Sequence, residues 1–374
     1  MIYFLFIGIN KALSNFVLRM KKLKIESGKN VLNALKPSRI ILPIVLGLGV
    51  AAYFLIRNFD VDQFSFFQWS FVSALWIMGA ILMMVIRDLA YIIRIKILTD
   101  QKLSWRQAFE IIMLWEFSSA VSPSVVGGIA PAIYFLYKEK LSAGQSTAVV
   151  LVAIFLDELF FILAIPLLLL FFGNAIFPAK DIALLSQLKY YFWLGYGIIF
   201  IYTLLLGYAI FINPHIIKSI LKWIFKLPFI RRWQDNVCLL SDQLIATSVW
   251  YKSKKIDFWF KSFLATVLSW TGRYWVVNLI FMAFFMDKLG WAEHFLIYAR
   301  QLTMWILLLI SPTPGGSGLA EFFFRDFLSD FIPNLNWVIP LALLWRLISY
   351  YPYLFIGAII LPRWVNRVFK KSKD

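Results

Sequence analysis

Residues 311–318 read Ser-Pro-Thr-Pro-Gly-Gly-Ser-Gly, and this helix-breaking run lies inside a segment that is otherwise apolar. A weaker copy, Ser-Pro-Ser-Val-Val-Gly-Gly, begins at Ser122, 189 residues earlier. Proline lacks the N–H that a helix needs and paired glycines favour other conformations, so we expect helices to break at both places. Two Gly/Pro-interrupted apolar segments in the two halves of a chain are typical of a membrane transporter's binding site.

The composition indicates a membrane protein. The chain is 61% hydrophobic and only 15% charged, whereas ordinary globular domains carry about 25% charge. Long apolar stretches follow one another, which predicts an all-α polytopic membrane protein. We expect about six full transmembrane helices, at 39–57, 69–93, 143–172, 188–212, 258–285 and 337–361, and two broken segments at 106–138 and 294–331.

The distribution of charge predicts the topology. The net charge of +17 does not indicate a nucleic-acid partner, because the basic residues lie between the apolar segments, as the positive-inside rule expects. If both broken segments are re-entrant hairpins, one side of the membrane carries 27 basic residues and the other carries 4. We therefore predict two hairpins, the first entering from the cytoplasm and the second from outside. Both termini are expected in the cytoplasm, and the location is the cytoplasmic (inner) cell membrane.

The 189-residue offset also relates longer elements. It carries 69–93 onto 258–282, and it carries Asp157 onto Arg346. Elements that recur in the same order with opposite orientation are typical of an inverted-topology repeat. We predict repeats at about 66–172 and 255–361 within a transmembrane domain at 39–361. A chance match between two similar helical patterns is the alternative.

The remaining segments are basic. Residues 1–38 are expected to form a cytoplasmic N-terminal segment with an interfacial helix, and 362–374 a cytoplasmic tail. The loop 213–257 has a lysine at every fourth position from Lys218 to Lys226, between apolar residues. This pattern is typical of an amphipathic helix on an anionic membrane surface. A solvated linker explains these lysines almost as well.

Polar groups within the membrane predict an anion site. A half-helix that begins at mid-membrane directs its N–H groups and positive dipole end at the cavity, which favours a lipid phosphate. Charged side chains there are costly and therefore candidates for function, and arginine binds phosphate through two hydrogen bonds. The predicted substrate-binding residues are Ser122, Pro123, Gly127, Gly128, Ser311, Thr313, Pro314, Gly315, Gly316, Ser317, Gly318, Glu321, Arg273 and Arg346.

Two adjacent carboxylates, Asp157 and Glu158, lie in the middle of the span 143–172. We expect one of them to pair with Arg346 or Arg273, and we expect the two carboxylates to couple transport to proton movement. The alternative is structural throughout: the prolines and glycines only make turns, and the charges only join helices.

Catalysis and metal binding have little support. No histidine lies in either broken turn to activate a serine, so nucleophilic catalysis is not expected. The lone Cys238 cannot form a disulfide framework or a thiolate metal site. We expect no cofactor.

These motifs resemble a known family. The Pro-Gly-Gly-x-Gly motif followed by a glutamate, and then an Arg-Leu about one span later, is similar to the lysylphosphatidylglycerol synthase transmembrane-region family. The matching residues are Pro314, Gly315, Gly316, Gly318, Glu321 and Arg346, and more weakly Pro123, Gly127, Gly128 and Asp157. The resemblance covers about 39–361 and implies a flippase-like domain. In bifunctional members, this domain moves aminoacylated lipid made by a soluble transferase domain, which we expect this chain to lack.

The leading hypothesis is a flippase or transporter of an anionic phospholipid or polyprenyl-type lipid. Its head group would bind at the membrane midplane between the hairpins. The alternative is a non-transporting membrane partner that scaffolds or presents lipid to a separately encoded transferase. A third hypothesis is a membrane-embedded transferase that acts on lipid head groups.

Overall fold

The computed structural model describes residues 70–122, 128–178, 182–213, 215, 245, 247–285, 288–309, 316 and 318–370. Within these ranges the regular structure is helical and contains no strand, which confirms the all-α prediction. The predicted span at 39–57, the N-terminal segment, the lysine-rich stretch of the 213–257 loop and the last four residues of the tail lie outside the described residues.

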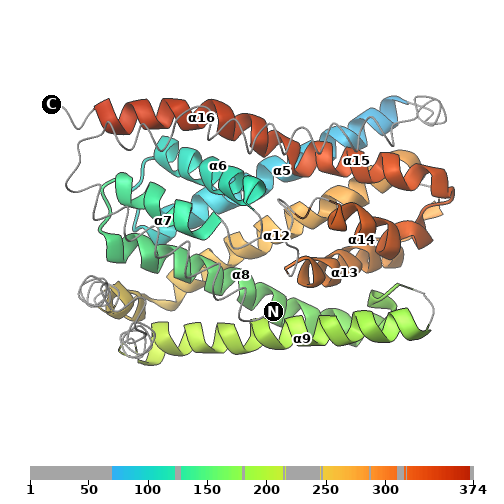
Figure 1. Ribbon diagram of the computed structural model, residues 1–374, viewed down its shortest axis with the longest axis horizontal. Helices are drawn as coiled ribbons and strands as arrows, with labels where there is room; N and C mark the ends of the chain where they lie inside the picture. Colours follow the sequence, from blue (N-terminus) through green and yellow to red (C-terminus); the bar gives the residue numbers. More distant parts are fainter. Residues whose placement is uncertain are drawn as a thin grey trace, which may run out of the picture.

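The helices follow the chain in one order that Figure 1 shows in colour. They are α5 (Phe71–Leu98), α6 (Trp105–Val121), α7 (Ile129–Lys138), α8 (Ala143–Phe172), η2 (Gly173–Ile176), α9 (Ile182–Gly207), η3 (Tyr208–Ile212), α12 (Ile256–Phe285), α13 (Trp291–Leu308), α14 (Leu319–Leu328), η6 (Ser329–Phe331), η7 (Leu335–Trp337), α15 (Val338–Ser349) and α16 (Tyr351–Lys370).

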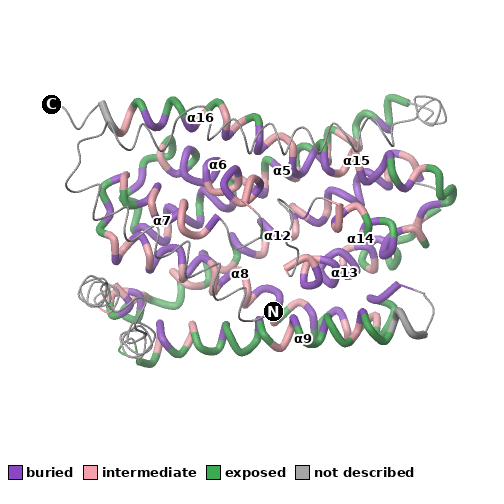
Figure 2. The backbone as a smooth tube through the Cα atoms, viewed as in Figure 1, coloured by how far each residue is buried: buried purple, intermediate pink, exposed green. Residues whose placement is uncertain are grey.

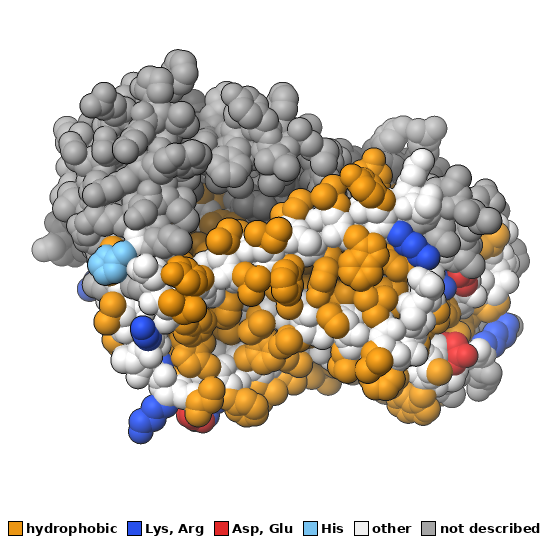
Figure 3. All heavy atoms as spheres, turned by 90° about the horizontal axis from the view of Figure 1, so that it is seen from below, with side chains coloured by type: hydrophobic (Ala, Val, Ile, Leu, Met, Phe, Trp, Pro, Cys, Tyr) orange, Lys and Arg blue, Asp and Glu red, His pale blue; other side chains and the backbone are white. Residues whose placement is uncertain are grey.

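Several helical stretches are suited to a bilayer. Four are long and apolar enough to cross a membrane, namely Phe71–Leu98, Ala143–Ile176, Ser186–Ile212 and Leu335–Val368, and they coincide with four of the predicted spans. A fifth predicted span is the 30-residue helix α12, which carries Asp257, Lys261 and Arg273 and is not one of the four. Figure 3 shows a face whose middle is apolar and whose charged side chains lie toward its two ends. The chain is therefore a multi-pass membrane protein.

The helices α5 and α12 form the centre of the molecule and run in opposite directions (Figure 1). The hydroxyl of Tyr251, just before α12, donates to the carbonyl of Leu98 at the end of α5, at 2.8 Å. Farther along, Ser269 donates to the carbonyl of Arg87 at 3.1 Å. Figure 2 shows buried residues along both helices where other helices cover them, whereas α9 has a long exposed face.

The two broken segments form pairs of helices at opposite ends of the molecule. The pair α6–α7 lies in one half and the pair α13–α14 lies in the other (Figure 1). Adding 189 to the bounds of α6 gives 294–310, against Trp291–Leu308 for α13. The same shift places α7 at 318–327, against Leu319–Leu328 for α14. The helix order thus recurs in the two halves, as two opposed hairpins would require; re-entry into a membrane and an inverted repeat stay predictions.

The base of the α6–α7 pair, where α6 begins and α7 ends, is bound to α16. Arg367 Nη2 lies 2.5 Å from the carboxylate of Glu110 in α6, and Arg367 also pairs with Glu139, the residue after α7. The indole of Trp364 donates to Glu139 at 2.8 Å. Two carboxylates of the first half therefore hold one end of a helix from the second half.

The base of the α13–α14 pair is fastened by Arg300 of α13. Its Nη1 donates to the carbonyl of Phe327 at 2.8 Å and to Asp330 at 2.7 Å, which joins the two helices of the pair. Its Nε donates to the carbonyl of Ala175 at 2.9 Å, in the turn that follows α8. Each hairpin is thus tied at its base to a segment from the other half of the chain.

The predicted span 337–361 is interrupted in the structure. Helix α15 ends at Ser349, Tyr350 adopts φ −128° and ψ −55°, and α16 begins at Tyr351. Pro352 has no N–H to continue the hydrogen bonds of α15, but it is tolerated in the first turn of a new helix. The break places Arg346 in the last turn of α15 instead of mid-helix.

Candidate functional site

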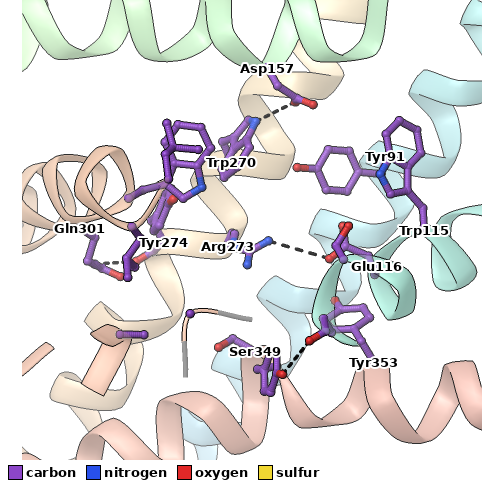
Figure 4. Close-up of a pocket in the computed structure, with 18 of the residues that line it drawn as sticks. Tyr91, Trp115, Glu116, Asp157, Trp270, Arg273, Tyr274, Gln301, Ser349 and Tyr353 are labelled. Carbon is purple, nitrogen blue, oxygen red and sulfur yellow. Dashed lines mark hydrogen bonds and ion pairs between the residues drawn. The ribbon is translucent and has the colours of Figure 1, made fainter. Parts of the chain in front are cut away.

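A cavity of about 280 Å³ lies between the two hairpins and the central helices (Figure 4). Its walls come from both halves of the chain. Predicted site residues at its surface are Asp157, Glu158, Arg273, Gly316 and Arg346. Asp157 and Arg346, which the 189-residue offset relates to each other, thus line the same cavity. The sequence therefore identified side chains from three separate helices that the fold brings together.

Aromatic side chains make up much of the wall, and sequence reasoning missed them. They are the four tryptophans Trp115, Trp270, Trp305 and Trp345 and the four tyrosines Tyr91, Tyr274, Tyr350 and Tyr353. In a chain that is 18% aromatic, none of them differs in sequence from the residues that face lipid. Their contribution depends on which way each helix faces.

Glu116 of α6 is shared unequally by two arginines. The fully buried Arg87 places Nη2 2.6 Å from Glu116 Oε1, and its Nη1 donates to Asp88 at 2.8 Å and to the Tyr353 hydroxyl at 2.7 Å. Arg273 of α12 approaches the other oxygen of Glu116 only to 3.9 Å, and 34% of its side chain is exposed. Arg87 is therefore the closer partner of Glu116 and also binds Asp88, whereas Arg273 makes no hydrogen bond with the residues that the structure describes.

Asp157 of α8 has a different partner from the one we expected. Arg94 of α5 donates to its two oxygens at 2.5 and 3.1 Å, and the indole of Trp270 donates to it at 2.8 Å. The prediction that Asp157 or Glu158 pairs with Arg346 or Arg273 is therefore wrong. The predicted span ended at residue 93, just before Arg94, whereas α5 continues to Leu98 and buries this arginine.

Arg346 pairs with Glu321 of α14. Arg346 Nε donates to Glu321 Oε1 at 2.8 Å, and the N–H of Gly318 donates to Oε2 at 2.6 Å. Gly318 has φ +87° and Gly316 has φ +69°, a region that favours glycine because it has no Cβ. Glu321 therefore caps α14 and binds Arg346, and its negative charge offsets the positive end of the helix dipole.

The first hairpin shows a different need for glycine. A Cβ on Gly128, which precedes α7, would lie 2.0 Å from Ser119 Oγ in α6, so glycine allows the close approach. Ser122 directly follows α6, and its N–H donates to the carbonyl of Ser118 at 3.2 Å. Neither residue lines the cavity. The predicted residues Pro123, Gly127, Ser311, Thr313, Pro314, Gly315 and Ser317 lie outside the described residues, so their roles stay predictions.

Glu158 lines the cavity next to Asp157, and its Oε2 is buried without a hydrogen-bond partner among the described residues. The proposed coupling role of these carboxylates stays a prediction. In the part of the chain that the structure describes, no three His, Cys, Asp or Glu side chains gather as a metal site requires.

These features define an α-helical multi-pass membrane protein with a charged, aromatic cavity between two opposed helix pairs. Residues 40–357 match the model of the family described as lysylphosphatidylglycerol synthase TM region, and the chain belongs to that family. It is similar to a UPF0104 membrane protein of Archaeoglobus fulgidus, with 28% identity over 330 residues, 82% of this chain and 91% of that protein. No solved structure matches the chain. The family match spans both helix pairs and the cavity between them.

Proposed function

We propose that this protein moves an anionic phospholipid or lipid-linked intermediate across the membrane and binds the head group in the cavity. The observation that carries this proposal is the state of Arg273. Its guanidinium lines a cavity built by both hairpins, and among the described residues its one ion pair, with Glu116, is 3.9 Å long. A guanidinium with free donors binds a phosphate through two parallel hydrogen bonds.

The helix end contributes less to anion binding than the sequence suggested. Because the Glu321 carboxylate accepts from the N–H of Gly318, the residue before α14, it competes there with any phosphate. Arg346 is likewise engaged with Glu321 at 2.8 Å. We therefore assign the main phosphate contact to Arg273 and a supporting electrostatic role to Arg346.

Membership of the family is compatible with transport without catalysis. The family is described as a membrane region, and the name of the similar Archaeoglobus fulgidus protein mentions no enzymatic activity. The excess of basic residues on one predicted side supports a cytoplasmic membrane with both termini inside. We propose this orientation together with the transport function.

The direct test is lipid translocation in proteoliposomes. The purified protein is reconstituted with fluorescent NBD-phosphatidylglycerol, and dithionite measures the label that reaches the outer leaflet. We expect translocation with the wild-type protein, loss with Arg273→Ala and partial retention with Arg273→Lys. The control is Arg106→Ala, which removes an arginine whose side chain is 74% exposed at the start of α6.

Two results would contradict the proposal in different ways. If Arg273→Ala translocates lipid at the wild-type rate, the cavity assignment is wrong. If the wild type binds anionic lipid but moves none, transport is wrong and the alternative is supported, in which the protein presents lipid to a separately encoded transferase.

A further inference from the structure

Three polar atoms at the cavity wall have no hydrogen-bond partner among the described residues. They are Glu158 Oε2, Gln301 Oε1 and the hydroxyl of Tyr274, and they come from α8, α13 and α12. Gln301 is 2% exposed and Tyr274 is 5% exposed. A buried polar group without a partner is costly, so three around one space indicate a ligand that satisfies them.

The neighbouring hydrogen bonds determine whether each of these atoms can act as a donor or an acceptor. Gln301 Nε2 donates to the carbonyls of Tyr274 and Ile297, at 2.9 and 3.2 Å, so its amide oxygen remains as an acceptor. Glu158 offers a second acceptor, and the Tyr274 hydroxyl can donate or accept. Figure 4 shows Gln301 and Tyr274 on one side of Arg273, with Glu116 on the other.

A hydroxyl group matches this set better than an ammonium group. Two neighbouring ligand hydroxyls can donate to Gln301 and Glu158 and accept from Tyr274. An ammonium can also donate to these groups, but it would lie in the same cavity as the like charge of Arg273. Two of the three protein groups are also neutral. Arg273 stands beside them as the cation for a phosphate.

We propose that the cavity selects head groups in which the phosphate carries a hydroxyl-rich substituent, such as a cyclic polyol or a sugar. This inference rests on the proposed function and names its substrate class. Arg273 binds the phosphate, and the substituent extends toward Gln301, Tyr274 and Glu158. The indole of Trp270, which stacks on Tyr274 with centroids 5.7 Å apart, forms the adjoining apolar wall.

The test compares lipids that share a phosphate and differ in the substituent. Translocation of labelled phosphatidylinositol, phosphatidic acid and phosphatidylethanolamine is measured in the same proteoliposomes. We expect phosphatidylinositol to move about tenfold faster than the other two. A head group that leaves a buried polar group of the cavity unpaired should bind roughly tenfold or more weakly. Tyr274→Phe and Gln301→Leu should each lower the ratio of the phosphatidylinositol rate to the phosphatidic acid rate.

The matched control is Tyr298→Phe, which removes a tyrosine hydroxyl from α13 that contacts Thr271 at 3.4 Å. It should keep the preference. A second measurement adds soluble myo-inositol 1-phosphate or inorganic phosphate and records the shift in melting temperature.

The outcomes distinguish failure of lipid transport from failure of the preference for hydroxyl-rich head groups. If no lipid moves, the proposed function fails. If all three lipids move at equal rates, or phosphatidylethanolamine equals phosphatidylinositol, the hydroxyl inference fails and transport stands. Stabilisation by soluble inositol phosphate without a lipid preference would assign the site to a free polyol phosphate and overturn the lipid form of the inference.

Discussion

Arg94 and Asp157 join α5 to α8 through two hydrogen bonds of 2.5 and 3.1 Å. Arg94 also donates to Thr266 at 3.0 Å, so the same guanidinium contacts α12. One ion pair therefore holds together three of the helices around the cavity. Arg273 differs, because within the described ranges its nearest carboxylate oxygen, on Glu116, is 3.9 Å away.

Breaking this pair should cost stability. In Asp157→Asn the buried charge of Arg94 loses its counterion, and removal of one partner of a buried pair costs about 3–5 kcal/mol. Replacing both residues, with Arg94→Met and Asp157→Leu, should cost less than the single change because no uncompensated charge remains. Melting temperatures in detergent measure both variants. A double variant less stable than Asp157→Asn would contradict this account.

The two roles of Glu321 can be separated. Glu321→Gln keeps an oxygen that can accept from Gly318 but removes the charge that holds Arg346, whereas Glu321→Ala removes both contacts. We expect Glu321→Ala to be less stable than Glu321→Gln by about 1 kcal/mol, the usual value of a helix cap. Lipid translocation should fall in both variants. Equal stability of the two would show that the cap contributes nothing.

Gly128 should be coupled to Ser119. Gly128→Ala places a Cβ 2.0 Å from Ser119 Oγ, although the backbone at Gly128 has ordinary helical angles. The strain is therefore steric, and Ser119→Gly should relieve much of it. We expect the double variant to be more stable than Gly128→Ala alone, which is the non-additivity of neighbouring sites. Additive losses in thermal unfolding would show that Ser119 is not the obstacle.

The base of the first hairpin should be sensitive to acid. Burial alone would raise the pKa of Glu139, but hydrogen bonds from Arg367, Gln107 and Trp364 outweigh it and hold the pKa below the ordinary value. The resulting stabilisation is present above the unfolded-state pKa, about 4.3, and is lost as the pH falls through the lower folded-state pKa. Glu139→Gln should weaken this acid-dependent loss. Unfolding midpoints measured from pH 6 to pH 3 test it, and an unchanged pH dependence would exclude Glu139.

The starts of α6 and α13 should face opposite sides of the membrane. In a Cys238→Ser background, Arg106→Cys and Trp291→Cys place thiols at side chains that are 74% and, for the whole residue, 72% exposed. An impermeant maleimide applied from outside should label position 291 and spare position 106 until the membrane is permeabilised. Labelling of both positions from one side would overturn the inverted topology.

Much of the helix arrangement could be predicted because its signals are local. Proline and glycine runs mark where α6 and α13 end, and the 189-residue offset predicted the bounds of α13 and α14 to within three residues. The break at Tyr350 was also visible in Pro352, but the apolar composition around it suggested one continuous span. A proline such as Pro352 predicts a helix break only if it is weighed apart from the apolar composition around it.

The ion pairs could not be predicted because they depend on how neighbouring helices are rotated. Asp157 and Arg346 both line the cavity, but their partners, Arg94 and Glu321, lie on helices whose facing surfaces the sequence does not specify. Only the contacts of Glu116 with Arg87 and Arg273 show its importance. The unpartnered oxygen of Gln301 leaves no sequence signal at all.

The division of the molecule between two opposed hairpins has an electrical consequence. In the predicted re-entrant arrangement, the pairs α6–α7 and α13–α14, which lie in separate halves of the molecule (Figure 1), would each cross only part of the membrane. Side chains at the cavity would then complete the barrier to ions, and we expect Trp305, which lines the cavity and stacks on Phe161 with centroids 3.9 Å apart, to be one of them. Replacing these rings by small residues is expected to raise the proton and ion conductance of the membrane before it unfolds the protein.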